Sequence, residues 1–520
     1  MHPKDAFSYF LQSFSFAFRS LIRTSDCVEG TCVRKKKIKS EPFYFVLYSL
    51  IRTFAAMLSD ELKIKIVQHM GFPPTEQQRQ AMNVFADFLF DRNPACVMIL
   101  RGAAGTGKTT LAAAIVRALL DMKQKLVLMA PTGRAAKVLS GYAHYPAFTI
   151  HRRIYRQKTA ADLSAFSLNA NLGSDTLFLV DEASMISNAG FSETFGSGCL
   201  LDDLMQFVYN GQNCRLLLIG DRAQLPPVGE DESPALMSDV LRGYGMKVYE
   251  MELDEVLRQS QESGILFNAT SIRRCEDAWT LPKLQLDGFD DIQVVPGDEL
   301  IESLATSYSR VGVDDTMVVT RSNKRANIYN QGIRNTVLDR EEELCRGDQL
   351  MIVKNHYGEN GLFLANGDRC VVQRVRNIRE EHGFRFADVT LQFPDFEPVL
   401  ELTSTVILDT LTSEAPALTR EQHEQLYSKV MEDYADIPLK ADRLKKLKTD
   451  VYYNALQVKY GYAVTCHKAQ GGQWAHIYID QGYMTDDMLT PDYFHWLYTA
   501  LTRATEKVFL VNWPKTQIKG

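Results

Sequence analysis

A glycine-rich segment has the composition and spacing of a phosphate-binding loop. The sequence GAAGTGKT, from Gly102 to Thr109, follows the apolar run VMIL and precedes the helical run TLAAAIVRALL. Glycines let the backbone wrap around a phosphate with its N–H groups pointing inward, and the start of a helix adds a favourable dipole. Lys108 is then placed for the β- and γ-phosphates of a nucleotide, and the Thr109 hydroxyl for Mg²⁺. The residues predicted to contact the nucleotide here are Gly102, Ala103, Ala104, Gly105, Thr106, Gly107, Lys108, Thr109 and Thr110.

Two carboxylates and an amide follow other apolar runs downstream of this loop. In VDEAS, Asp181 can hold Mg²⁺ through water, and Glu182 can accept a proton from an attacking water. Adjacent carboxylates after a strand are often only solvated turn residues, but a phosphate-binding loop upstream favours the catalytic interpretation. In IGDRAQLPPVG, Gln224 could hydrogen-bond the γ-phosphate, because ligands bind at this end of strands in such sheets. A simple Gly-Asp turn would not account for the glutamine.

The elements that must position these groups alternate between strand and helix. Short apolar, β-rich runs lie at 97–100, 125–130, 177–180 and 215–220, and again at 317–320, 476–480 and 507–511. Helical segments separate them, and this alternation predicts the α/β class, with parallel sheets covered on both faces. Between the later runs, RGDQLMIVKN, NGDRCVVQRV and FADVTLQF have the pattern of short antiparallel strands, and a charged helical stretch follows them. We therefore expect a small β-barrel-like module inserted into the second α/β unit.

The beginning of the chain differs from the rest. It is rich in Phe and Ser and carries a basic run, and Met57 then begins an amphipathic helix. The earlier residues are either an over-long start assignment or a real appendage. The predicted organisation is an extension at 1–56, a first domain at 57–252, a second domain at 253–344 and 456–520, and the inserted module at 345–455.

Composition and charge are those of an ordinary soluble globular protein. Of 520 residues, 45% are hydrophobic and 23% charged, and the net charge of −6 allows a nucleic-acid partner only if its groove is locally basic. Nine cysteines, an odd number, favour reduced thiols and a cytoplasmic location. The apolar stretch FYFVLYSLI, with about nine residues, is too short for a membrane span, which needs roughly 20. We therefore expect no membrane partner.

Eight motifs occur in an order that resembles one helicase family. They are GAAGTGKT, APTGRAAKVLS, TIHR, VDEASM, GDRAQLPPVG, LRQ, VTCHKAQG and YTALTRA. Together they resemble superfamily 1 DNA helicases of the RecD-like and Dda-like group, which moves 5′ to 3′, over roughly residues 70–515. The resemblance implies two RecA-like domains that hold Mg-ATP between them, with an SH3-like insert in the second.

The resemblance also implies roles for further residues. Gln78 resembles the glutamine that reads adenine, although Gln77 competes for this role and a polar helix start is the alternative. Arg258 and Arg503 resemble two arginines that reach the γ-phosphate from the second domain; surface arginines at helix ends are the alternative. The expected catalytic residues are Lys108, Glu182, Gln224, Arg258 and Arg503.

The same resemblance implies contacts with single-stranded DNA across both α/β domains. The matching residues are Pro131, Thr132, Thr149, His151, Thr465 and His467. Hydroxyl and imidazole groups suit phosphate hydrogen bonds, which position a strand without reading its sequence. Arg134 and Lys137 could add positive charge, with solvation on a helix surface as an equal alternative.

Two places bear on how closely the chain follows the family. The stretch at about 154–176 stands where relatives insert a β-hairpin or pin that splits the duplex, and here a plain loop is an equal alternative. After VTCHKAQG many relatives carry a glutamate that contacts the nucleotide sugar, whereas this chain has Gln473. Glutamine keeps an acceptor but loses the charge.

The expected function is ATP-dependent unwinding of DNA, powered by hydrolysis of Mg-ATP. The expected partners are single-stranded DNA and DNA duplex junctions, with a monomeric protein. The alternatives are a DNA-stimulated translocase that does not separate strands, an RNA-directed helicase, and a nucleic-acid binding factor that uses ATP only as a switch.

Overall fold

The computed structural model describes residues 41–159, 162–190, 197–255, 262–277, 279–358, 362–396, 398–484 and 488–519. The chain divides into two compact units, Met1–Met57 and Leu58–Gly520. Helix α2 (Glu41–Met70) runs through the division, so this helix begins well before Met57, where the sequence pattern placed its start. Residues 1–40, most of the expected extension, lie outside the described residues.

The first α/β domain is built on a six-stranded parallel sheet. The strand order is β3-β2-β6-β7-β1-β8, and every neighbouring pair is parallel. The strands are β1 (Cys96–Gly102), β2 (Lys125–Ala130), β3 (Ala147–Thr149), β6 (Thr176–Val180), β7 (Arg215–Gly220) and β8 (Lys247–Leu253). The helices are α3 (Glu76–Leu89), α4 (Lys108–Asp121), α5 (Gly133–Ala143), α6 (Ile150–Ile154), α7 (Leu200–Tyr209) and α8 (Ser238–Gly243). The four apolar runs predicted here are β1, β2, β6 and β7.

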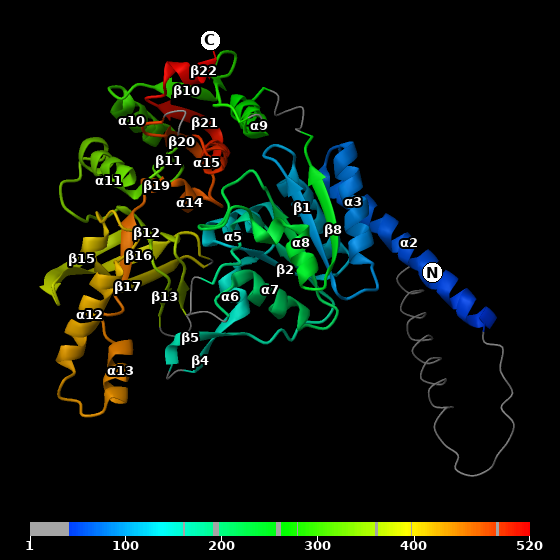
Figure 1. Cartoon of the computed structure of the whole chain (residues 1–520), viewed down its shortest axis with the longest axis horizontal. Helices are drawn as coiled ribbons and strands as arrows, with labels where there is room; N and C mark the ends of the chain where they lie inside the picture. The colour runs from blue at the N-terminus through cyan, green and yellow to red at the C-terminus, as the bar shows by residue number, and fades with distance from the viewer. Residues whose placement is uncertain are drawn as a thin grey trace. The chain divides into compact units, whose positions relative to one another are not determined.

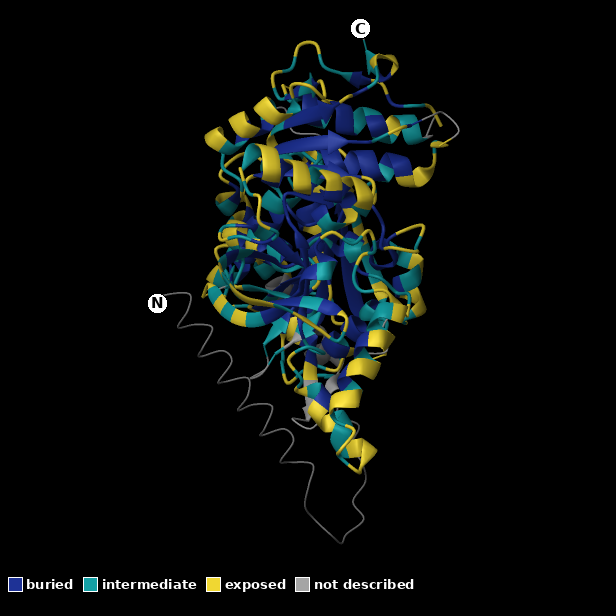
Figure 2. Cartoon of the chain, turned by 90° about the vertical axis from the view of Figure 1, so that its left-hand side faces the viewer, coloured by how far each residue is buried: buried dark blue, intermediate teal, exposed yellow. Residues whose placement is uncertain are grey.

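Both faces of this sheet are covered. Along β1, Met98 and Leu100 belong to one apolar core, and Val97 and Ile99 belong to another on the opposite face. Successive side chains of a strand point to opposite faces, so fully apolar strands such as β1 require cover on both sides. Figure 2 shows buried strands covered by helices whose outer faces are exposed.

The second α/β domain has a five-stranded parallel sheet in the order β10-β21-β20-β11-β19. Its strands are β10 (Ile292–Val295), β11 (Thr316–Thr320), β19 (Ala463–Thr465), β20 (Trp474–Asp480) and β21 (Ala504–Val511). Its helices are α9 (Gly264–Asp277), α10 (Leu300–Arg310), α11 (Asn323–Gly332), α14 (Cys466–Ala469) and α15 (Pro491–Leu501), and β9 (Leu284–Gln285) pairs with β22 (Ile518–Lys519). The prediction of two α/β domains with parallel sheets is confirmed (Figure 1).

The inserted module is a closed barrel of five strands. They are β12 (Gln349–Ile352), β15 (Arg369–Glu381), β16 (Phe384–Phe393), β17 (Leu400–Ile407) and β18 (Leu456–Tyr460). The expected segment 345–455 leaves out β18, because a helical hairpin of α12 (Arg420–Asp433) and α13 (Lys440–Lys448) separates this strand from β17. A small hairpin of β13 (His356–Tyr357) and β14 (Phe363–Leu364) projects between β12 and β15. That the barrel is of the SH3 type stays a prediction.

The barrel is fixed to the second sheet by a shared core and a buried polar network. Val318 and Tyr478 of the sheet and Leu350 of the barrel belong to one apolar core. The fully buried Asp348 carboxylate accepts hydrogen bonds from Arg334 (3.0 Å), Arg340 (2.7 Å) and the Tyr462 hydroxyl (2.8 Å). A carboxylate is stable in such a place only when it is paired and hydrogen-bonded, so this network holds the barrel in one position on its sheet.

The stretch after α6 forms an antiparallel hairpin of β4 (Tyr155–Thr159) and β5 (Asp162–Leu168). The plain-loop alternative for 154–176 is therefore not what the chain adopts. Figure 1 shows the hairpin projecting from the first domain.

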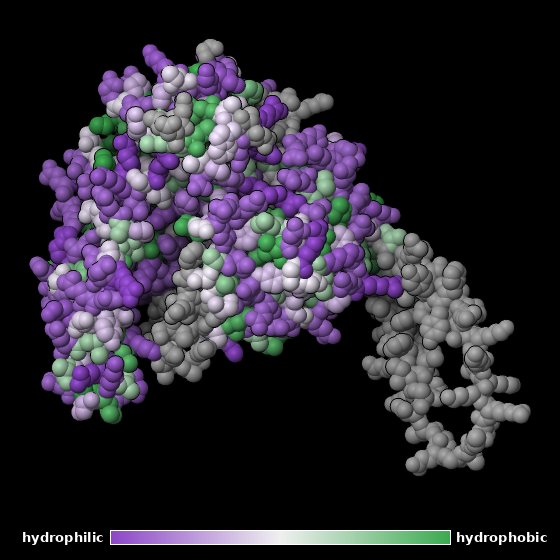
Figure 3. Space-filling model, viewed as in Figure 1, coloured by the Kyte–Doolittle hydropathy of each residue, from purple (hydrophilic) through white to green (hydrophobic). Residues whose placement is uncertain are grey.

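The visible face of the folded unit is mostly hydrophilic, with small scattered hydrophobic areas (Figure 3). Among the residues that the structure describes, no helix combines the length and the apolar character that crossing a bilayer requires.

The later half of α2 belongs to the first domain. Leu62, Ile66 and Met70 are buried in its core, and Leu62 is the earliest core member among the described side chains. We predict that a protein starting at Met57 melts within about 4 °C of the full chain. A matched protein starting at Gly71 loses three buried side chains, each worth about 1.5–3 kcal/mol, and should melt more than about 8 °C lower. Thermal melting followed by circular dichroism compares the three; equal losses from both truncations would contradict the prediction.

Candidate nucleotide site and adjoining groove

The phosphate-binding loop joins β1 to α4, and its backbone requires glycine at two positions. Gly105 and Gly107 have φ of 77° and 79°, the left-handed region that side chains rarely adopt. At Gly102 a Cβ would lie 2.9 Å from Leu253 Cβ, so glycine permits the close approach of β8. The Thr106 hydroxyl donates to the Ala103 carbonyl at 2.8 Å and stiffens the turn. The loop therefore ends at the N-terminus of α4, the geometry that favours an anion.

Lys108 lies within the loop's curve. Its Nζ donates to the Gly102 carbonyl and to the Ala103 carbonyl (2.8 Å), and it lies 3.8 Å from Asp221 Oδ2. The ammonium group thus sits between the loop and the carboxylate that follows β7. This is the position in which its charge can meet a phosphate.

Asp181 and Glu182 follow β6 at the same edge of the sheet. The Glu182 N–H donates to Asp181 Oδ1 (2.9 Å), and Glu182 adopts a left-handed φ of 53°. Burial, together with the neighbouring negative charge of Glu182, raises the pKa of Asp181. A divalent cation would reverse this effect, and Thr109 lines the same cavity as Asp181. A hydroxyl and a carboxylate are oxygen donors of the kind that Mg²⁺ takes, so these residues fit the ion.

Arg503 reaches this edge from the second domain. Its side chain is 4% exposed, and Nη1 lies 3.4 Å from Glu182 Oε1. With its amide nitrogen toward the carboxylate, Gln224 donates to Glu182 Oε2 and accepts from Arg503 Nη2, each at 3.2 Å. This orientation satisfies both neighbours, whereas the reverse would face oxygen to oxygen. One carboxylate, one amide and one guanidinium therefore connect the two domains.

These groups line one cavity of about 530 Å³. A volume of roughly 300–1,000 Å³ is typical of small-molecule sites. The predicted site residues that line it are Ala103, Ala104, Gly105, Gly107, Lys108, Thr109, Thr110, Asp181, Glu182, Gln224 and Arg503. Gln473 lines it as well, so the residue that departs from the family lies at this site. Arg258 lies outside the described residues.

Gln78 and Gln77 both have structural partners. Gln78 is buried; its Oε1 accepts from the Thr75 N–H (3.1 Å) in a capping box, and its Nε2 donates to the Thr106 carbonyl (3.2 Å). Gln77 Oε1 accepts from the N–H groups of Asp254 (2.7 Å) and Glu255 (2.9 Å). Gln78 is not among the cavity's lining residues. Its adenine-reading role stays a prediction. In the structure, Gln78 is hydrogen-bonded to the phosphate-binding loop.

A basic groove of about 660 Å³ contains three of the predicted DNA contacts, Thr132, Thr465 and His467. It is formed by both α/β domains and the barrel, and its basic residues are Arg134, Arg321, Lys324, Arg369 and Lys468. Arg134 is largely occupied elsewhere, because it stacks on Trp474 (4.4 Å to the ring centroid) and donates to the Gln473 carbonyl. Pro131 directly precedes Thr132, whose hydroxyl caps α5 by accepting from the Ala135 N–H (3.2 Å).

Two cations of the groove, Lys468 and Arg321, form no ion pair with a carboxylate of the described residues. The ion pairs and hydrogen bonds of the described residues include none for the Lys468 ammonium group, and burial lowers its pKa to about 8. Burial also lowers the pKa of His467, so this imidazole offers a neutral hydrogen-bonding group. Lys324 is paired with the exposed Glu414 (3.7 Å). A phosphate in the groove could therefore meet positive charge at both Lys468 and Arg321.

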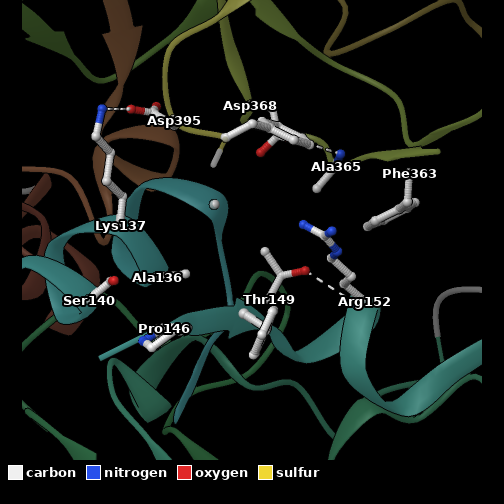
Figure 4. Close-up of a pocket in the computed structure, with 14 residues that line it drawn as sticks. Ala136, Lys137, Ser140, Pro146, Thr149, Arg152, Phe363, Ala365, Asp368 and Asp395 are labelled. Atoms are coloured by element: carbon white, nitrogen blue, oxygen red, sulfur yellow. Dashed lines mark hydrogen bonds and ion pairs between the residues drawn. The ribbon is translucent and has the colours of Figure 1, made fainter. Parts of the chain in front are cut away.

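The other predicted contacts lie near a second cavity, of about 250 Å³, between the first domain and the barrel (Figure 4). Thr149 lines it, and its hydroxyl accepts from the Arg152 N–H at 3.2 Å. Arg152 extends into the cavity beside Phe363 of strand β14. The His151 ring lies 5.6 Å from Tyr155 and 6.1 Å from Phe363, and burial lowers its pKa to about 4. His151 is therefore a neutral member of an aromatic group where the barrel meets the first domain.

On its far wall this cavity is closed by a cross-domain ion pair. Lys137 Nζ donates to the Pro394 carbonyl (2.9 Å) and lies 3.1 Å from Asp395 Oδ1 of the barrel. Lys137 therefore connects domains, instead of lying free on a helix surface.

Comparison with known proteins agrees with this geometry. Residues 74–288 match the family model described as an AAA domain, and residues 460–511 match the UvrD-like helicase C-terminal domain. These two family models cover parts of both α/β domains, and the second of them is named for helicases. The resemblance inferred from the eight motifs is thereby confirmed.

Two curated proteins are similar to this chain over long segments. The ATP-dependent DNA helicase dda of Enterobacteria phage T4 is 26% identical over 296 residues, 54% of this chain and 60% of the phage protein. The ATP-dependent RecD2 DNA helicase of Deinococcus radiodurans is 24% identical over 425 residues, 79% of this chain and 46% of that protein. The chain thus spans less than two thirds of either relative's length.

Solved structures of similar proteins include a Pif1 helicase from Bacteroides in complex with ADP-AlF3 and single-stranded DNA. That structure aligns with 86% of this chain, and the chain with 95% of it, at 15% identity and a TM-score of 0.44. A Pif1 helicase from Candida albicans aligns at 14% identity and a TM-score of 0.41, over 86% and 96% of the two chains.

Several polar and charged groups of the site and the groove were not singled out from the sequence. Lys468, Arg152 and Tyr498 stand inside VTCHKAQG, TIHR and YTALTRA, so the motifs contained them. Their roles depend on partners from other elements, which no motif specifies. Arg321 and Arg369 belong to no motif, and nothing in the sequence marks them as groove residues.

The hydrogen bond between Gln78 and the phosphate-binding loop can be tested by mutation. Gln78→Ala leaves the Thr106 carbonyl and the Thr75 N–H without their partner, so we expect stability to fall by about 1–3 kcal/mol. Because the loop serves any nucleotide, affinity for ATP and GTP analogues should fall by the same factor. Gln80→Ala, on the exposed face of the same helix, is the matched control. Nucleotide titrations and thermal melting measure both effects, and a loss confined to adenine nucleotides would restore the adenine-reading role.

Proposed function

We propose that this protein is an ATP-dependent DNA helicase that moves 5′ to 3′ on single-stranded DNA and unwinds duplex. One observation carries the proposal. Lys108, Asp181, Glu182 and Gln224 of the first domain and Arg503 of the second converge on one cavity. A cavity that needs both domains for completion ties chemistry to their relative motion.

Within this proposal each residue has a role set by its charge and place. The loop amides and Lys108 bind the phosphates, and Thr109 and Asp181 hold Mg²⁺, which neutralises charge on the transferred phosphoryl group. Glu182 orients the attacking water and takes its proton. Arg503 offers positive charge from the opposite wall, in the manner of an arginine finger. Gln224, between Glu182 and Arg503, is positioned to respond to the γ-phosphate.

Coupling to movement follows from the same contacts. Because Arg503 belongs to the second domain, hydrolysis is favoured only when the two domains are close together. Closing on ATP and opening after hydrolysis would change the spacing between Thr132 on one domain and Thr465 and His467 on the other. If the two domains bound the DNA strand tightly in turn, the protein would advance along the strand.

The basic groove supports single-stranded DNA as the track. Its hydroxyl, imidazole and ammonium groups suit phosphate contacts, which are independent of base sequence. Lys468, Arg321 and Arg369 supply positive charge despite the chain's net charge of −6. The β4–β5 hairpin is the candidate pin at a duplex junction. A monomeric state and a cytoplasmic location complete the proposal.

Three alternatives differ in measurable ways. A translocase would hydrolyse ATP on single-stranded DNA without separating strands, and an RNA-directed enzyme would be stimulated by RNA instead. A binding factor that uses ATP as a switch would turn over slowly even with saturating DNA. Glu182 and Arg503 at 3.4 Å favour hydrolysis, because a switch has no need of either.

Glu182 gives the first test of hydrolysis. Glu182→Gln keeps the shape of the side chain but removes its capacity to take a proton. We expect DNA-stimulated turnover to fall by about 10²–10⁴-fold, the range typical for a lost general base, while nucleotide and DNA binding persist. Lys108→Ala should weaken nucleotide binding itself. Glu232→Gln, an exposed carboxylate paired with Arg222 at 2.9 Å, is the control; a Glu182→Gln rate above about a tenth of wild type would refute the assignment.

The tail preference of unwinding tests direction. A duplex with a 5′ single-stranded tail should be unwound in the presence of Mg-ATP, and a 3′-tailed or blunt duplex should not. Strand release followed by fluorescence measures this on three substrates of equal sequence. A preference for the 3′ tail would reverse the proposed direction, and ATP turnover on all tails without strand release would favour the translocase.

A further inference from the structure

Helix α15 of the second domain presents three polar side chains to the loop that follows β7. Tyr498 donates to Asp221 Oδ2 (2.6 Å), and Thr499 Oγ1 accepts from the Leu225 N–H (2.8 Å). His495 Nδ1 bonds the Ala223 carbonyl at 3.0 Å. Helix α15 of the second domain therefore contacts the loop that carries Gln224 at three points.

Tyr498 differs from the other two because it also contacts the phosphate-binding loop. Its hydroxyl accepts a hydrogen bond from the Ala104 N–H at 2.8 Å. Asp221 Oδ2, which receives the Tyr498 proton, lies 3.8 Å from Lys108 Nζ. The hydroxyl thus connects the loop and Asp221 on the side of the loop where the lysine lies. The ring is 1% exposed, so no other rotamer is open to it without movement of α15.

Protonation of the hydroxyl is well defined. Burial and the negative charge of Asp221 raise the pKa of Tyr498 well above its usual value. The group is therefore a neutral phenol that donates a hydrogen bond to Asp221 and accepts one from the Ala104 N–H.

An amide N–H has a single hydrogen, so it makes one well-aligned hydrogen bond at a time. Ala104 is one of the loop residues that line the cavity, and loop amides are the groups that cradle phosphates. A phosphate oxygen that accepts from the Ala104 N–H must therefore replace the Tyr498 oxygen. Tyrosine and nucleotide compete for one donor.

We propose that Tyr498 is a positioning residue whose hydroxyl holds the Ala104 amide until a nucleotide phosphate takes its place. The inference rests on the proposed binding of ATP at this loop. Displacement frees α15 from the phosphate loop, and Arg503 follows directly on this helix. The helix thus carries the group that phosphate displaces, and the chain just after its end carries the guanidinium that meets Glu182, so the arrival of phosphate is passed to the second domain.

Tyr498→Phe tests the competition, because it keeps the ring and removes the hydroxyl. A fluorescent, non-hydrolysable ATP analogue is titrated into the full chain in the absence of DNA. Losing a competitor worth one hydrogen bond should make the analogue bind about two- to tenfold more tightly. In contrast, stimulation of ATPase by single-stranded DNA should fall, because α15 no longer responds to phosphate.

Thr499→Val is the matched control. It removes a contact between the same helix and the same loop but touches no phosphate-loop atom, so its analogue affinity should equal that of the wild type. If both variants bind the analogue equally more tightly, general loosening of the domain contact is the cause and the proposal is overturned. Unchanged or weaker binding by Tyr498→Phe, with melting within about 4 °C of wild type, overturns it as well.

Failure of the proposed function is visible separately. If the wild-type protein shows no saturable binding of the analogue, or if Lys108→Ala binds it as well as wild type does, the nucleotide assignment itself is wrong. The comparison between Tyr498→Phe and wild type addresses the competition only once that binding is established.

Discussion

The contact among Glu182, Gln224 and Arg503 is the interaction on which the arrangement of the two α/β domains depends. Burying a carboxylate or a guanidinium costs free energy unless the two groups pair with each other. Here they pair only when the two domains are held in one relative position. Other hydrogen bonds between the domains stabilise the same relative position. Gln470 donates to the Leu225 carbonyl at 2.6 Å, and α15 holds the rest of the same loop. The cavity is therefore a property of the pair of domains.

The fold was predictable wherever the apolar pattern is continuous. Strands such as β1 and β7 are buried on both faces, so their sequences contain apolar runs that no helix period explains. The edge strand β8 was missed because KVYEMEL is half-exposed and lacks such a run. The end of the barrel was misplaced for another reason. The segment LQVKY is strand β18, and only its pairing with β12 and β17 shows that it belongs to the barrel. Its position in the sequence, just before the strands of the second sheet, does not show this.

The site was predictable to the extent that its chemistry resides in short motifs. The glycines, Lys108, Asp181 and Glu182 are fixed by loops of a few residues after strands, and these loops bring them to one cavity. The partners of Gln78 and Tyr498 were not predictable. Gln78 bonds a carbonyl 28 residues away, and Tyr498 an amide 394 residues away. Distances of this kind depend on how helices pack, which spacing along the chain does not encode.

The barrel's attachment has a mechanical consequence. Its core is continuous with one face of the second sheet, and the buried network around Asp348 adds polar contacts at the junction. Its contacts with the first domain are individual side-chain contacts, such as the ion pair of Lys137 with Asp395 (3.1 Å) and the packing of Phe363 on His151. A rotation at the ATP cavity would then sweep the barrel as a rigid lever. The groove walls that contain Arg369 and Arg321 would then move together past Thr132. A small angular change at the nucleotide would become a larger displacement at the DNA-binding groove.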